Sequence, residues 1–244
     1  MKRLMLFILF ICNFYAYGKP LIIGVPEFAP PFVSTSSGGT VFYGFNIDLM
    51  NSICKIIRME CAYKGMNLQK LFTSLNTGEV DIVLAPTPIV PTYNSDYIFS
   101  IPYLPSNVQF VTLKSNNTIN TVKDLKGKKI GVLKYTLYGG LLEDNFQNLF
   151  ELVEFPKIAD MATALTNQDI DAVVLNANVA KYALSNSTTE LKLIGEEVPI
   201  GNGYGILSLK KNAPLIKEIN SALLKIEENG TYLTIYNTYF GDGG

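Results

Sequence analysis

Histidine, the residue that most often acts as a general base, is absent from this 244-residue chain. Catalytic triads of the Ser-His-Asp type and Cys-His pairs both need an imidazole, so the composition excludes both kinds of active site. Imidazole is also the commonest metal ligand, and two cysteines without it make a poor zinc site. We therefore expect no metal, no cofactor, and a binding protein rather than an enzyme.

A proline-rich loop is the stretch that points most directly to binding. It follows Val80–Leu84, whose β-branched and apolar residues are typical of a buried strand in an α/β sheet. Pro86, Pro88 and Pro91 prevent the loop from continuing as a helix or a central strand. Open α/β sheets usually hold ligands at the carboxyl ends of parallel strands. Because another apolar run, Val108–Leu113, soon follows, we expect a ligand beside a hinge.

The first 18 residues have the pattern of a cleaved signal peptide. Lys2 and Arg3 are basic, Leu4–Ile11 is an apolar run, and Ala16-Tyr17-Gly18 offers small residues for cleavage. The run is shorter than the about 20 residues that a transmembrane helix needs. We expect an exported, soluble protein of the periplasm. The alternatives are an uncleaved N-terminal anchor and a lipoprotein attached through Cys12.

Cys54 and Cys61 are the two cysteines that remain after the expected cleavage. They lie close in sequence, near a helix–turn–strand corner, and export takes them into an oxidising compartment. Such a corner can bring two Cα atoms within disulfide range. A disulfide and a pair of free thiols are both open at this point.

Charge argues against nucleic acid as a partner. Without its first 18 residues the chain keeps 18 basic and 21 acidic residues and no basic cluster. Apolar residues make up 48% of the sequence, so the mature chain can bury a sizeable core. Its length fits one large or two modest domains.

Strand and helix patterns alternate in two similar sets. The predicted elements are Leu21–Val25, a helix from about Phe45 with Asn46 as its N-cap, Ala62–Lys64, Leu68–Leu75 and Val80–Leu84, then Lys129–Leu133, Leu137–Phe146 and Glu151–Phe155. Residues 74–83 match residues 164–173 in pattern, which indicates two α/β lobes joined near Pro105–Gln109. Tyr204–Leu209 is predicted to return to the first lobe, before helices at Ala213–Gly230 and Tyr232–Phe240.

Eight short stretches follow one another along nearly the whole mature chain: Pro30–Phe32, Gly44–Leu49, Gly78–Asp81, Phe99–Tyr103, Asp124–Lys128, Asp171–Val174, Glu228–Thr231 and Tyr239–Gly241. In this order they resemble the extracytoplasmic solute-binding proteins of the polar amino acid ABC-importer family. That family includes lysine/arginine/ornithine- and glutamine-binding proteins. Cys54 and Cys61 also occupy the positions of the disulfide in its lysine/arginine/ornithine-binding branch.

The resemblance implies an α/β, two-lobed periplasmic-binding-protein fold with two interlobe connections (type II). Each lobe would be a mainly parallel sheet flanked by helices. Lobe 1 would comprise residues 19–107 and 204–244, and lobe 2 residues 108–203. The lobes would close on a small-molecule ligand by hinge motion and then dock on an ABC-importer permease in the membrane. We expect a monomer.

The residues at the family's binding positions differ from the usual ones. In amino-acid-binding members a Ser or Thr, and an Arg five residues later, hold the α-carboxylate; here these positions are Pro88 and Tyr93. The Asp that usually pairs with the α-ammonium corresponds to Asn176. A Gly-Ser/Thr pair corresponds to Tyr135-Thr136, which keeps the hydroxyl.

Other expected ligand contacts come from both lobes. Phe28 or Phe32 supplies an aromatic face, although core packing is an equal alternative for Phe32. Leu68 stands where some relatives carry a second aromatic residue, and Lys134 is either a cleft charge or a solvated surface lysine. The full predicted set is Phe28, Leu68, Pro86, Thr87, Pro88, Tyr93, Lys134, Thr136 and Asn176.

We therefore predict an extracytoplasmic solute-binding protein that captures a small polar solute, an amino acid or related metabolite, for an ABC importer. One alternative is a ligand-sensing or partner-binding module on the same fold. A further alternative is an enzyme like cyclohexadienyl dehydratase, for which Glu27 is the acid placed to act. The substituted positions predict a ligand that is neutral or differently charged from a free amino acid.

Overall fold

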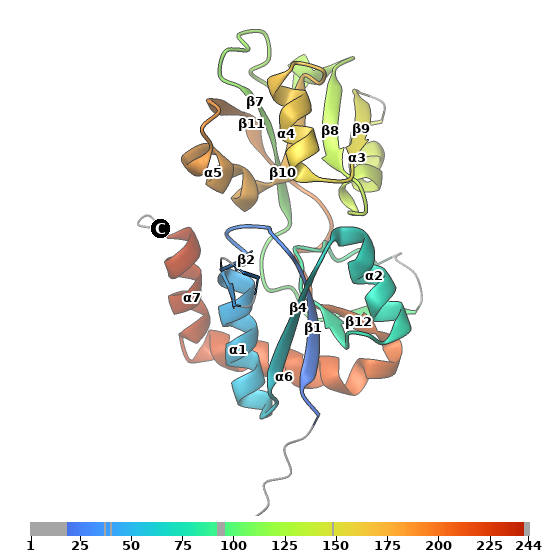
Figure 1. The fold of residues 1–244 in the computed structure, drawn as a ribbon, viewed down its shortest axis with the longest axis vertical. Coiled ribbons are helices and arrows are strands. Elements are labelled where there is room, and N and C mark those ends of the chain that lie inside the picture. The colour runs from blue at the N-terminus through green and yellow to red at the C-terminus, as the bar shows by residue number, and fades with distance from the viewer. Residues whose placement is uncertain (1–18, 37, 40, 92–95, 148, 242–244) are drawn as a thin grey trace, which may run out of the picture.

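The computed structural model describes residues 19–36, 38–39, 41–91, 96–147 and 149–241. The predicted signal peptide and Tyr93 lie outside the described residues. Within those residues, no helix combines the length and the apolar character that crossing a membrane requires. Figure 1 shows two lobes, one above the other, with a sheet in each.

The first lobe is built on a five-stranded sheet with helices packed against it. Across the sheet the strands are β4 (Cys61–Met66), β1 (Leu21–Pro26), β5 (Ile82–Val83), β12 (Leu207–Leu209) and β6 (Tyr97–Phe99). The helices are α1 (Phe45–Ile57), α2 (Leu68–Thr77), α6 (Ala213–Glu228) and α7 (Thr231–Phe240), with a short turn η2 (Lys210–Asn212) before α6. A small hairpin joins β2 (Ser34–Thr35) to β3 (Phe42–Tyr43).

The second lobe repeats this plan. Its strands are ordered β11 (Leu191–Pro199), β7 (Asn107–Leu113), β10 (Ala172–Asn176), β8 (Lys129–Leu133) and β9 (Glu151–Phe155). Packed on them are α3 (Tyr138–Phe146), α4 (Ile158–Thr166) and α5 (Ala177–Asn186), and a short turn, η1 (Val122–Leu125), precedes β8. β8, β9 and the start of α6 fall at the predicted residues, and β12 returns to the first sheet as predicted.

Both sheets are mixed but mainly parallel, as expected, because one strand in each runs against the other four. In the first, β1 pairs in parallel with β4 and β5, while β12 is antiparallel to β5 and β6. In the second, β8 pairs in parallel with β9 and β10, while β7 is antiparallel to β10 and β11. The reversed strands are β12 and β7, and each is the first strand after the chain passes from the other lobe, so it enters its sheet from the opposite end.

The predicted N-cap of the first helix is wrong. Asn46 lies inside the first turn of α1, fully buried, and Gly44 is the N-cap. Gly44 has a φ of 127°, and a Cβ there would lie 2.4 Å from the carbonyl oxygen of Phe32. A glycine is therefore required where the chain turns into α1, and the asparagine follows it.

Two antiparallel segments connect the lobes. Tyr204 donates its backbone N–H to Leu104 (2.8 Å) and accepts from Tyr103 (2.9 Å), and Ile200 donates to Ser106 (2.8 Å). The Ser106 hydroxyl also donates to the carbonyl of Ile200 and accepts from the N–H of Gly203. The two connections that the resemblance implies are thus tied to each other by hydrogen bonds.

Cys54 and Cys61 form a disulfide, which resolves the alternative left open by the sequence. Cys54 lies in the last turn of α1 and Cys61 begins β4, with their Cα atoms 6.1 Å apart. The bond fixes the helix to the edge strand of the first sheet.

Candidate functional site

A cavity of about 230 Å³ lies between the two lobes. The first lobe contributes the end of β1, the start of α2 and the proline-rich loop after β5. The second lobe contributes the turn from β8 into α3, the residues after β9, and the junction of β10 with α5. These segments lie at the carboxyl ends of parallel strands, where α/β folds place ligands.

Five of the predicted first-lobe residues line this cavity: Phe28, Leu68, Pro86, Thr87 and Pro88. Phe28 is 61% exposed, so its ring stands free at the wall. Thr87 is buried and its backbone N–H donates to Ala85 at 2.6 Å. Pro86 and Pro88 have no N–H, so this loop offers a ligand few backbone donors.

On the second lobe, Thr136 and Asn176 line the cavity as predicted. The hydroxyl of Thr136 donates to the carbonyl of Leu133 at 2.7 Å. Tyr135, which also lines the cavity, has a φ of 64°. This backbone conformation favours glycine, which accounts for the glycine that the resemblance places at this position.

Asn176 has a structural role that the sequence pattern did not reveal. It is the N-cap of α5, and its Oδ1 accepts from the N–H groups of Asn178 (2.8 Å) and Val179 (3.2 Å). Its Nδ2 faces the hydroxyls of Tyr138 and Tyr204, is buried, and forms no well-aligned hydrogen bond. The amide is therefore held by the helix that it caps.

Lys134 is not among the residues that line the cavity. Its ammonium lies 3.9 Å from a carboxylate oxygen of Glu154 and 5.6 Å from the centre of the Tyr135 ring. The side chain is exposed, which matches the alternative of a solvated surface lysine. Sequence position alone placed it near the cleft, but its charge is directed toward the neighbouring strand β9.

The sequence patterns did not reveal a pair of buried tyrosines, one lining the cavity and the other in contact with it. Tyr138 lines the cavity, and its hydroxyl lies 3.3 Å from the hydroxyl of Tyr204 and 3.3 Å from the carbonyl oxygen of Pro86. Tyr204 donates to the carbonyl of Asn107 at 3.2 Å. Burial raises the pKa of Tyr138 to about 12, so it stays protonated at neutral pH. No local motif signals these contacts, because their partners are far away in the sequence.

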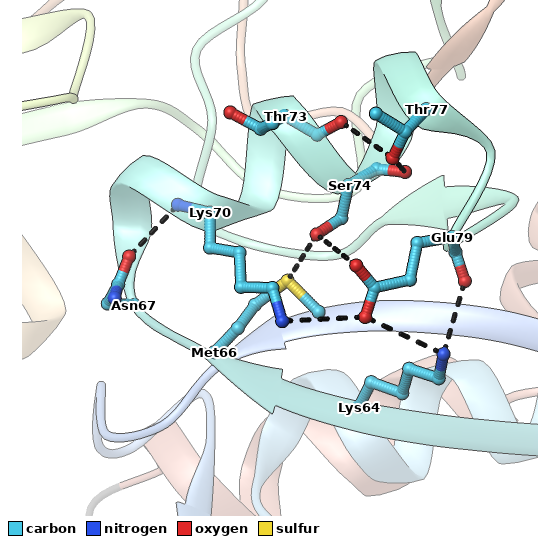
Figure 2. A network of polar contacts seen from close by, with 8 residues as sticks. All are labelled: Lys64, Met66, Asn67, Lys70, Thr73, Ser74, Thr77 and Glu79. Atoms are coloured by element: carbon cyan, nitrogen blue, oxygen red, sulfur yellow. Dashed lines mark hydrogen bonds and ion pairs between the residues drawn. The ribbon is translucent and has the colours of Figure 1, made fainter.

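A polar network holds the start of α2 against the first sheet (Figure 2). Asn67 caps the helix by accepting from the N–H of Lys70 at 2.9 Å. The Glu79 carboxylate lies 3.5 Å from the Lys70 ammonium and 3.7 Å from that of Lys64, and accepts from the Ser74 hydroxyl. Loss of hydration opposes its ionisation, but the two lysines lower the pKa of this carboxyl. The network fixes one wall of the cavity.

Comparison with known proteins identifies the family. Residues 21–242 match the model of the bacterial extracellular solute-binding proteins, family 3. The chain belongs to this family. It is 28% identical to an arginine-binding periplasmic protein of Mannheimia haemolytica over 99% of both chains. It is 30% identical to putative ABC transporter arginine-binding protein 2 of Escherichia coli K12 over 86% of both.

A solved structure supports the same conclusion for this family 3 protein. The periplasmic binding protein of an arginine 3rd transport system from Legionella pneumophila superposes with a TM-score of 0.86. It is 36% identical, and the match covers 91% of this chain and all of that one. The two-lobed fold and the general function predicted from the sequence, solute binding, are thereby confirmed. The relatives are binding proteins rather than enzymes.

Proposed function

We propose that this family 3 protein captures an amino acid or a related small polar metabolite between its lobes and delivers it to an ABC-importer permease. The observation that supports this most strongly is the cavity, because residues of both lobes line it and two hydrogen-bonded segments beside it link the lobes. Relatives whose names describe them as periplasmic binding proteins for arginine favour the periplasm as the place of capture.

The proposal includes how the chain is divided. Residues 19–107 with 204–244 would move as one lobe and residues 108–203 as the other, in a monomer. Ligand contacts would come from the predicted residues that line the cavity, Phe28, Leu68, Pro86, Thr87, Pro88, Thr136 and Asn176, together with Tyr93. Among the described lining residues, Glu27 supplies the negative charge that a cationic ligand group needs.

Thermal-shift screening of the mature protein against small metabolites tests this proposal. A ligand that binds only the folded state stabilises it by about 2.7 kcal/mol at a concentration 100 times its Kd, so a true ligand raises the Tm clearly. Leu68→Ala should weaken that shift, since it removes a wall of the cavity. Leu224→Ala, an exposed leucine on α6, is the matched control. If no small polar solute raises the Tm, solute capture is wrong; turnover of prephenate or arogenate would instead support the enzyme.

A further inference from the structure

We propose that the ligand is an organic cation without a carboxylate, such as an alkyl amine or an alkyl guanidine. This inference rests on the proposed function, because it assumes that the interlobe cavity is where the solute binds. It goes further by naming the chemical class that the cavity walls accept.

The charge of the cavity is the first reason. Glu27 is the one residue with a formal charge among the described residues that line it. Glu27 follows β1 directly, is exposed, and forms no ion pair with any residue that the structure describes. The nearby cation Lys134 lies outside the lining and is paired with Glu154. The walls therefore attract a positive ligand group and provide no lysine or arginine for a negative one.

Hydrogen-bond donors are the second reason. A buried carboxylate needs several donors or a cation, because losing its hydration costs several kcal/mol. Pro86 and Pro88 have no N–H, and the N–H of Thr87 is already bonded to Ala85. The Thr136 hydroxyl gives its proton to Leu133. Among the described lining residues, the buried Nδ2 of Asn176 has no hydrogen-bond partner, and the start of α3 lacks a side-chain cap, but neither the neutral amide nor the helix N–H groups bring a full positive charge. The N-terminus of a helix carries only about half a unit charge.

Aromatic rings are the third reason. Phe28, next to Glu27 on the first lobe, is 61% exposed, and Tyr135 on the second lobe is 39% exposed. Tyr138 also lines this cavity. The face of an aromatic ring attracts ammonium and guanidinium groups. The Glu27 carboxylate and the aromatic rings from both lobes together form a binding site suited to a cation.

Isothermal titration calorimetry with matched pairs tests the proposal. Agmatine is compared with arginine, and cadaverine with lysine, because each pair differs only by the carboxylate. We expect the decarboxylated member of at least one pair to bind at least about tenfold more tightly. Glu27→Gln should weaken that binding by about tenfold or more. Glu60→Gln, which changes an exposed glutamate before β4, should leave it unchanged, and equal Tm values would show that both variants fold.

The outcomes separate this inference from the proposed function. If arginine and lysine each bind at least as tightly as their decarboxylated partners, the inference is overturned and solute capture still stands. The same holds if none of the four compounds binds while another solute in the screen does. Unchanged agmatine or cadaverine affinity in Glu27→Gln also overturns it. If no solute of any class binds, the proposed function itself fails.

Discussion

At the scale of single residues, the polar side chains around the cavity mostly serve their own backbone. Asn176 caps α5, Asn67 caps α2, and Thr136 bonds the carbonyl of Leu133. Such local bonds compete with ligand contacts, because the Oδ1 atoms of both asparagines and the hydroxyl proton of Thr136 are engaged before a solute arrives. The groups left for a ligand are then chiefly the Glu27 carboxylate, the aromatic rings and the unpaired Nδ2 of Asn176.

The role of Asn176 leads to a stability prediction. Asn176→Ala removes the acceptor for two N–H groups of α5, so the free energy of unfolding should fall by about 1 kcal/mol. Asn176→Ser keeps a capping oxygen and should lose much less. Urea unfolding of the mature protein without ligand measures both. Equal stability of the alanine and serine variants would contradict the capping role.

At the scale of elements, the segments predicted best from the sequence are those whose structure depends on their own local pattern of residues. Lys129–Leu133 and Glu151–Phe155 form strands at the predicted bounds, because short apolar runs between polar turns specify buried strands. The Val80–Leu84 run is equally apolar, yet only Ile82–Val83 pairs as a strand. Its length is limited by the partners that β1 and β12 offer, which the run itself does not encode.

The residues of the candidate site could likewise be predicted only where a local sequence pattern determines their place. Loop residues such as Thr87 follow a recognisable strand, so their place at the cleft could be expected. The direction of the Lys134 side chain depends on Glu154, and the burial of Tyr138 depends on Pro86 and Tyr204. These partners are brought together only by the folded lobes, and no local pattern marks them.

The disulfide between α1 and β4 gives a prediction at this scale. Reduction, or Cys54→Ala with Cys61→Ala, frees a short loop and should lower the free energy of unfolding by about 2–3 kcal/mol. The denatured, unreduced protein from the periplasm should show no titratable thiol from this pair. Unfolding curves that coincide with and without a reducing agent would show that the bond contributes nothing to stability.

At the scale of the whole molecule, the lobes are linked by two segments and by a tyrosine contact beside them. The segments are joined to each other by backbone hydrogen bonds, and Tyr204, fully buried, lies at their centre against Phe32. Tyr138 of the second lobe reaches the carbonyl of Pro86 in the first. Two connections of this kind would allow one lobe to rotate against the other, as the proposed capture of a solute between the lobes requires.

The last prediction concerns this motion. If both lobes clamp the solute, small-angle X-ray scattering should give a smaller radius of gyration with saturating ligand than without. Tyr138→Phe removes the hydroxyl that joins the lobes, a hydrogen bond of about 1 kcal/mol. The variant without ligand should therefore have a larger radius than the natural protein. Tyr236→Phe, which alters α7 within the first lobe, should not change the radius.

The radius of gyration with and without ligand also tells whether the lobes clamp the solute at all. An unchanged radius under a ligand concentration that saturates the calorimetric signal would mean that the lobes do not close on the solute. Solute binding would then occur on a rigid molecule, and the sensing or partner-binding alternative would gain support. A different result is that ligand reduces the radius of the natural protein, but the ligand-free Tyr138→Phe variant has the same radius as the natural protein. The lobes would then be restrained by the hydrogen bonds between Leu104, Ser106, Ile200 and Tyr204 and not by the Tyr138 hydroxyl.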